Sequence, residues 1–131
     1  MSTRMTLRPQ SVISNGDMSG NLVSDPTILQ ALTIGTYTFE WAGASPVGTI
    51  QFQVSNNYSL NQNGTVKNPG TWVTGYVFDP STQSWINQIP VSGNTGEGVI
   101  EFSSGAYAVR VIYTATSGTG ALQAVINGKV A

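Results

Sequence analysis

Apolar and polar residues alternate along several short segments of the chain, as expected for β-strands that are buried on one face only. Residues 36–41 and 47–54 show this alternation most clearly. Their apolar positions are Tyr37, Phe39, Trp41, Ile50, Phe52 and Val54. Residues 43–46 contain Gly and Pro and lie between the two segments, which predicts a turn and a β-hairpin across it.

Further strands are predicted over residues 71–78, 84–86, 99–102, 106–114 and 121–126. Residues 55–70 are mostly Asn, Ser, Gln and Gly, and form the longest predicted loop. Within the strand at 71–78, Gly75 is expected to mark a bulge. Residues 117–120 predict a tight link between the last two strands. Residues 27–34 fit either a strand or a helical turn.

These segments amount to about seven to nine short strands with no convincing helix, a pattern typical of antiparallel sandwiches. The sequence therefore predicts an all-β fold: a single antiparallel β-sandwich of jelly-roll or immunoglobulin-like topology. A chain of 131 residues has the usual size of one domain. We expect residues 36–131 to form the sandwich body and residues 1–35 an N-terminal arm or the first strands. The expected core includes Phe39, Phe52, Val109 and Val111.

Charged residues make up only 8% of the chain, against about 25% in an ordinary soluble protein. The five cations are spread along the sequence, at Arg4, Arg8, Lys67, Arg110 and Lys129. Because they form no basic stripe, we expect no binding to nucleic acid or to anionic membranes. The chain has neither His nor Cys, which excludes Ser-His-Asp and Cys-His catalysis and the usual zinc sites.

Two carboxylates, Glu40 and Glu101, lie within predicted strands. A pair of carboxylates is the minimum for glycoside hydrolysis. The simpler interpretation is that each faces solvent or pairs with Arg110, as charges on strands commonly do. We therefore expect no enzymatic activity and no cofactor.

Other polar motifs are explained by turns. Asp17, Asp25 and Asp79 lie in loops beside Asn, Gly or Pro, as calcium ligands would, but without the spacing of a calcium-binding loop. Turn formation is the simpler explanation. Residues 118–120 resemble a phosphate loop but lack the following helix and Lys, so a hairpin turn is expected.

Aromatic residues suggest a surface on which a sugar could stack. The aromatic candidates are Trp41, Trp72, Trp85, Tyr58 and Tyr76. Trp41 and Trp72 lie in strand-like segments and are expected in the core, whereas Tyr58 and Trp85 lie among polar residues and are expected to be exposed. Arg110 lies in a segment that is partly apolar on both faces, which is typical of a covered strand or a subunit contact. Tyr58, Trp85 and Arg110 are therefore the predicted contacts for a glycan or a protein partner.

Three stretches resemble parts of small all-β proteins carried in the virions of tailed bacteriophages. They are FEWAGASPVGTIQFQVSNN, NGTVKNPGTW and GAYAVRVIYTATSGTGALQAVINGKV, and the resemblance covers roughly residues 36–130. It implies a non-enzymatic structural component of the virion, in capsid decoration or in a tail or fibre. The alternative is a module that binds a cell-surface polysaccharide, because similar strands and turns occur in adhesion and carbohydrate-binding modules.

The resemblance sets the expected partners, which are other virion proteins, further copies of the chain and, for the alternative, a host surface glycan. Arg4 and Arg8 lie in a Ser- and Thr-containing leader that is expected to form a docking arm, a solvated tail or a first strand. The leader has no apolar stretch of secretory-signal length, and no run approaches the ~20 apolar residues of a membrane helix. We therefore expect synthesis in the host cytoplasm, no membrane insertion and a final location in the virion.

Overall fold

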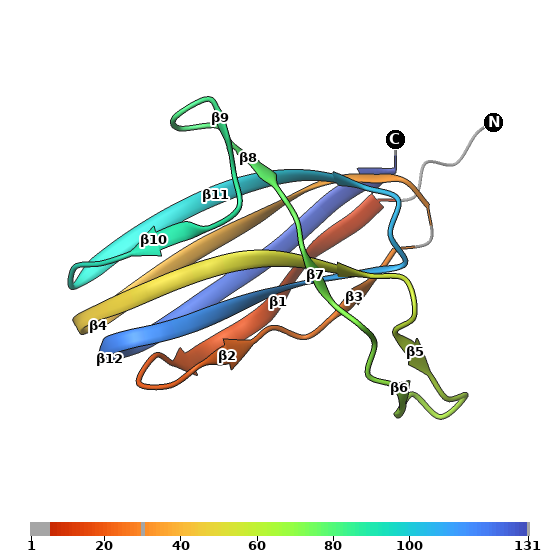
Figure 1. Ribbon diagram of the computed structural model, residues 1–131, viewed down its shortest axis with the longest axis horizontal. Coiled ribbons are helices and arrows are strands. Elements are labelled where there is room, and N and C mark those ends of the chain that lie inside the picture. Colours follow the sequence, from red (N-terminus) through yellow and green to blue (C-terminus); the bar gives the residue numbers. More distant parts are fainter. Residues whose placement is uncertain (1–5, 30, 131) are drawn as a thin grey trace.

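The computed structural model describes residues 6–29 and 31–130, and these form an all-β protein without helices (Figure 1). The predicted all-β, sandwich-like fold is confirmed. The strands are β1 (Thr6–Asp17), β2 (Leu22–Val23), β3 (Thr27–Ile28), β4 (Thr33–Ser55), β5 (Ser59–Leu60), β6 (Val66–Asn68), β7 (Val73–Thr74), β8 (Val77–Asp79), β9 (Ser84–Ile86), β10 (Ile89–Val91), β11 (Thr95–Ser104) and β12 (Ala108–Val130). They are more numerous than the sequence predicts, and two of them, β4 and β12, are 23 residues long.

The strands β4 and β12 pair with each other in antiparallel register from Ser55 opposite Ala108 to Thr33 opposite Val130. They do not run straight. Tyr37 and Phe52 lie 15 residues apart on β4, which is about 50 Å along a straight strand. Their ring centroids are 6.1 Å apart, so the strand folds back on itself. The predicted hairpin between residues 36–41 and 47–54 is therefore wrong, because both segments are halves of β4 and each pairs with β12.

Glycines make the shared bend of β4 and β12 possible. A Cβ on Gly43 would lie 2.3 Å from Gly120 Cα, so the two strands approach too closely for side chains. Gly118 has a φ of 80°, and Ser45, on the neighbouring strand, has a φ of 49°. The pairing register shifts twice between Ala115 and Thr119. Residues 43–46 and 117–120, predicted as two separate turns, instead form one corner where both strands pass between layers.

Each layer contains half of both long strands. The first layer holds β1, the C-terminal half of β12, the N-terminal half of β4, and then β11, β8 and β9. The second layer holds β2 and β3, the other halves of β12 and β4, and β10 and β7. Residues 6–28 thus contribute the first strands of the sandwich. The segment 71–78 is not one strand, because the chain leaves β7 at Gly75, whose N–H donates to Phe52 O, and reaches the first layer at β8.

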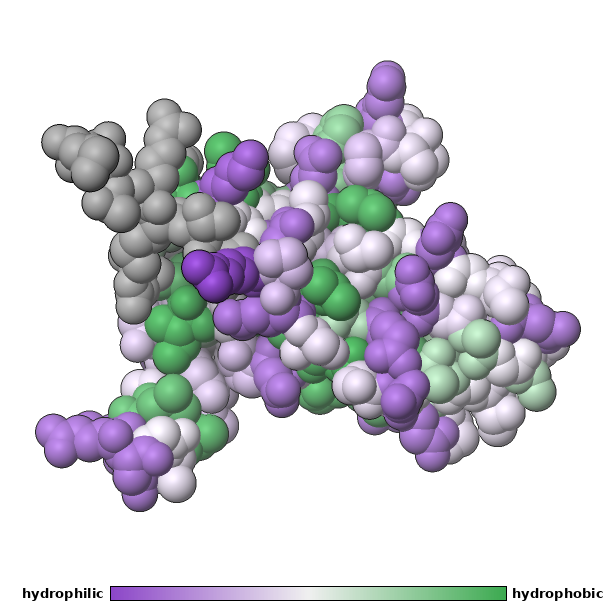
Figure 2. Space-filling model, turned by 180° about the vertical axis from the view of Figure 1, so that it is seen from behind, coloured by the Kyte–Doolittle hydropathy of each residue, from purple (hydrophilic) through white to green (hydrophobic). Residues whose placement is uncertain are grey.

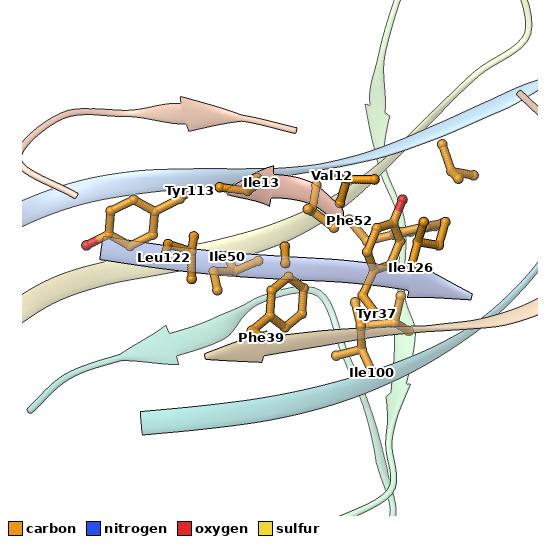
Figure 3. Packing of buried hydrophobic residues seen from close by; sticks show 14 of the residues in the cluster. Val12, Ile13, Tyr37, Phe39, Ile50, Phe52, Ile100, Tyr113, Leu122 and Ile126 are labelled. Carbon is orange, nitrogen blue, oxygen red and sulfur yellow. The ribbon is translucent and has the colours of Figure 1, made fainter. Parts of the chain in front are cut away.

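The core lies between the layers (Figure 3). Tyr37 and Phe102 of the first layer have ring centroids 5.6 Å apart, and Phe102 lies 5.1 Å from Phe52 of the second. The predicted core residues Phe39, Phe52, Val109 and Val111 are all buried, which confirms that part of the prediction. Within the described residues, no helix is long and apolar enough to cross a membrane.

Candidate interaction surfaces

Arg110 lies half-buried on the outer side of the second layer. Its Nε donates to Gln53 Oε1 at 2.9 Å, and its guanidinium carbon lies 4.3 Å from the centroid of a Trp72 ring. Burial lowers the pKa of the Arg110 guanidinium, which nevertheless stays charged at neutral pH. Of the two alternatives predicted for Glu40 and Glu101, pairing with Arg110 is wrong, because these carboxylates lie on the outer side of the first layer. Exposure to solvent is confirmed for both.

Tyr58 is buried, with 8% of its surface exposed, so the prediction that it is exposed is wrong. Its ring packs 5.7 Å from that of Trp72, whose indole Nε1 donates to Pro69 O at 2.8 Å. Trp72 itself is half-buried rather than a core residue. The polar segment folds back because Asn57 Oδ1 accepts a hydrogen bond from Thr71 N at 2.7 Å. Tyr58, Trp72 and Arg110 therefore form a stack that holds this segment on β12.

Trp85 is 68% exposed, which confirms the prediction for this residue. It lies on β9 directly opposite Phe78 of β8, and the two rings meet edge to face at 5.6 Å. Tyr76, just before β8, is also 68% exposed. The β8–β9 hairpin projects from the sandwich (Figure 1). We call Tyr76, Phe78 and Trp85 the aromatic hairpin. Trp85 packs on Phe78, whereas Arg110 packs on Trp72, so Trp85 and Arg110 belong to two different aromatic contacts.

Of the two arginines predicted to form a docking arm, Arg8 lies exposed on β1 and Arg4 lies outside the described residues. Because β1 pairs with β12 from Thr6 onward, Arg8 belongs to a strand of the sandwich. Docking through these residues stays a prediction.

Glu40 and Glu101 do not come together. Glu40 of β4 lies opposite Glu97 of β11, whereas Glu101 lies opposite Thr36. Glu101 is therefore four residues farther along β11, which is about 13 Å. A glycosidase places its two carboxyl groups roughly 5–9.5 Å apart. This pair does not form the arrangement that glycoside hydrolysis requires.

Of the three aspartates predicted in loops, Asp17 is the last residue of β1 and Asp79 the last residue of β8, and each binds the turn that follows. Asp17 Oδ1 accepts from Ser19 N at 2.9 Å, and hydrogen bonding to Ser19 lowers the pKa of the Asp17 carboxyl. Asp79 Oδ1 accepts from Ser81 N and Ser81 Oγ, which likewise lowers the pKa of Asp79. Asp25 donates its backbone N–H to Val12 O. In the part of the chain that the structure describes, no three acidic residues gather as a metal site would require.

A pocket lies beside the outer edge of β11. This strand pairs with β4 along its whole length but with β8 only where Glu101 meets Phe78. A pocket of about 470 Å³ adjoins the edge and has Trp41, Ile89, Pro90 and Val99 as apolar walls. The carboxylates of Asp79 and Glu97 also line it. We call this the edge pocket.

Sequence reasoning did not single out Glu97. The sequence feature that could have indicated Glu97 is its position between Gly96 and Gly98. Glycines within a strand leave room for another side chain or backbone to approach it closely. A Cβ on Gly96 would lie 2.2 Å from the Trp41 ring, so the indole lies across this glycine. Gly96 therefore explains how a large aromatic residue reaches the pocket beneath an edge strand, whereas Gly98 faces Ile89.

The outer face of the first layer mixes polar and apolar residues (Figure 2). Val125 of β12 and Val99 of β11 flank Thr38 of β4 in one row, and the two valines are 36% and 40% exposed. Hydrophobic residues are interspersed with hydrophilic ones across the view, and the exposed carboxylates of Glu40, Glu97 and Glu101 belong to the same face.

No protein-family model matches the chain, and no curated protein matches it either. Among solved structures, the fold is similar to the crystal structure of the SPBc2 prophage-derived protein YomS, with a TM-score of 0.58. The two chains are 9% identical, and the likeness covers 97% of this chain and 96% of the other. At that identity the comparison shows the fold alone: the whole sandwich is shared with a protein derived from a prophage.

Proposed function

We propose that this chain is a non-enzymatic structural component of a phage particle and acts through protein–protein assembly, as a capsid decoration or as part of a tail or fibre. The observation that carries the proposal is the likeness in fold, over 97% of the chain, to a prophage-derived protein. It agrees with the resemblance of residues 36–130 to virion proteins. Because a fold hosts many functions, the proposal also needs support from the surface.

The surface supports assembly in two ways. The chain carries a net charge of -1, so copies repel one another little when they are crowded on a particle. Exposed apolar side chains, including Val99, Val125 and Trp85, offer contact area without a cost for burying charge. Both features suit a protein that works next to further copies of itself and other virion proteins.

The test is to purify particles of the phage that encodes the chain, on a density gradient, and to identify their polypeptides by mass spectrometry. The expected result is recovery of this polypeptide in a fixed ratio to the major capsid or tail protein, with antibody labelling at one place on the particle. Absence of the polypeptide from intact particles would overturn the proposal.

A second function, binding of a host surface polysaccharide, is favoured by the aromatic hairpin. Tyr76 and Trp85 are both 68% exposed, and exposed rings of this kind can stack on sugar faces. A glycan array with the wild-type chain and with Trp85→Ala tests it, and Tyr107→Ala, which removes an exposed aromatic residue elsewhere, serves as the control. Binding that Trp85→Ala alone removes supports this function, and no binding to any surface glycan contradicts it.

A further inference from the structure

The strand edges of the sandwich differ in how they are protected. Strands at sheet edges offer unpaired N–H and C=O groups, and proline or bulges usually prevent other chains from pairing with them. β1 contains Pro9 and three shifts of register against β12. β10 contains Pro90. Residues 95–100 of β11 contain neither proline nor a register shift against β4, and among the described residues they pair with no strand on their outer side.

The edge pocket beside residues 95–100 is acidic. Its described lining contains the carboxylates of Asp79 and Glu97 and no Lys or Arg. Ser81 donates two hydrogen bonds to Asp79 Oδ1, and hydrogen bonding to Ser81 and Thr82 lowers the pKa of Asp79, so this carboxylate stays ionised at neutral pH. Glu40 lies directly opposite Glu97 on β4, one strand in from the edge, and adds a further negative charge next to Glu97. A cationic side chain is the chemical complement of this pocket.

We propose that residues 95–100 of β11 bind an extended segment of a partner protein by strand addition, with a Lys or Arg of that segment in the edge pocket between Asp79 and Glu97. In strand addition the main chain supplies affinity and the pockets for alternate side chains supply specificity. Six residues of edge, about 20 Å, are enough for a strand of ordinary length. The inference rests on the proposed function, because it names the kind of partner that an assembling protein would hold.

Charge selects the occupant. A second copy that paired through its own β11 edge would bring another Glu97 and Asp79 toward the same carboxylates, and like charges placed opposite one another oppose pairing. A basic segment gains from the same charges. The expected partner is therefore a strand other than β11 of a second copy, and it carries cationic residues at alternate positions.

The probe is a fluorescein-labelled heptapeptide, TKVKVKT, with blocked ends, which places its lysines on one face of a strand. We expect saturable binding, with slower hydrogen exchange of the amides in residues 95–100. Glu97→Lys should weaken binding and raise the dissociation constant at least about tenfold. Glu101→Lys, which makes the same charge change about 13 Å along the same strand, is the matched control and should leave binding within about twofold.

A second probe has the same side chains but N-methyl groups at alternate backbone positions, which removes its strand hydrogen bonds without changing either the protein or the charge. It should bind at least about tenfold more weakly. Equal binding of both probes, equal effects of the two substitutions, or no binding of TKVKVKT at about 1 mM would each overturn the inference. So would self-association through β11 in sedimentation. Recovery of the chain in particles together with any of these results would leave the proposed function standing.

Discussion

Glu97 of β11 lies directly opposite Glu40 of β4 on the outer face of the first layer, and both side chains are exposed. Cβ atoms of directly opposed residues in an antiparallel pair are about 4.5–5.5 Å apart. On its other side Glu40 faces the neutral Gln123 of β12. Two of the few charges of this chain therefore repel each other across one strand pair.

Replacing one of the two opposed carboxylates by a neutral isostere should stabilise the fold. We expect Glu40→Gln to raise the free energy of unfolding by about 0.2–1 kcal/mol in low salt. The gain should shrink at about 1 M salt, because exposed charges are screened there. Urea denaturation at two salt concentrations measures it, with Glu101→Gln, which faces Thr36, as the control. A gain of the same size at both salt concentrations would contradict the explanation.

Phe39 is completely buried, and its ring stacks on Tyr37 with centroids 6.1 Å apart. Phe39→Ala should lower the free energy of unfolding by about 3–5 kcal/mol, since it leaves a cavity between the layers. Phe78→Ala, at a half-buried ring on the projecting hairpin, should cost clearly less. Chemical denaturation of both variants gives the comparison. A loss below about 1 kcal/mol for Phe39→Ala would contradict its place in the core.

Gly118 has a φ of 80°, and a Cβ at this position would lie 2.1 Å from Ser45 O. Gly118→Ala should therefore strain the corner at which β4 and β12 bend and cost at least about 1–3 kcal/mol. Gly105→Ala is the matched control, because an added Cβ there meets no atom within 4 Å. Thermal unfolding of the two variants distinguishes a strained corner from a general effect of losing glycine. Equal changes in Tm would show that the corner tolerates a side chain.

Tyr37 is buried, its hydroxyl has no hydrogen-bond partner among the described residues, and burial raises the pKa of the phenol above its ordinary value of 10.0. The folded state therefore keeps this proton when the unfolded chain loses it. The contribution of the protonated Tyr37 to the free energy of unfolding is fully present below pH 10.0 and falls as the pH rises above that value. Tyr113, whose pKa is also raised by burial, adds a change of the same sign.

Tyr37→Phe should remove the share of this alkaline destabilisation that belongs to Tyr37. At neutral pH it should raise the free energy of unfolding by about 1 kcal/mol, because an unpaired hydroxyl is no longer buried. Denaturation curves from pH 7 to pH 11 measure both effects, and Tyr107→Phe, at an exposed tyrosine, is the control. If Tyr37→Phe destabilises the protein at pH 7, the hydroxyl has a partner and the explanation fails.

The contact between Arg110 and Trp72 should appear as a coupling energy. We expect a double-mutant cycle with Arg110→Met and Trp72→Leu to give about 0.5–1 kcal/mol, the usual range for a cation over an aromatic ring near the surface. Arg110→Lys should retain only part of it, because an ammonium lacks the planar group that stacks on the indole. A coupling energy near zero would mean that the two side chains are neighbours without mutual stabilisation.

The predicted strands and core follow from local pattern. The alternation at 36–41 and 47–54 appears in β4, where Tyr37, Phe39 and Phe52 point inward. The exposure of Trp85 could also be predicted, because it lies in a short polar segment. These features depend on the alternation of side chains along one strand, so they can be predicted from the amino-acid sequence alone.

Gly43 and Pro46 indicated a change of direction, but not that β12 bends beside them, since this depends on the approach of Gly43 to Gly120. Tyr58 became buried because the polar segment around it folds back through hydrogen bonds such as that between Thr71 and Asn57. Register placed Glu97, rather than Glu101, opposite Glu40.

The sequence by itself determined that the chain forms strands with one apolar face, that it has a weakly charged surface, and that it lacks His and Cys chemistry. Only the tertiary structure decided which strands pair, where they bend and which carboxylates share a pocket. The physical reason is range. Alternation is set by neighbours along the chain, whereas register, corners and pockets are set by residues that can lie more than a hundred positions apart in the sequence, as Thr6 and Lys129 do.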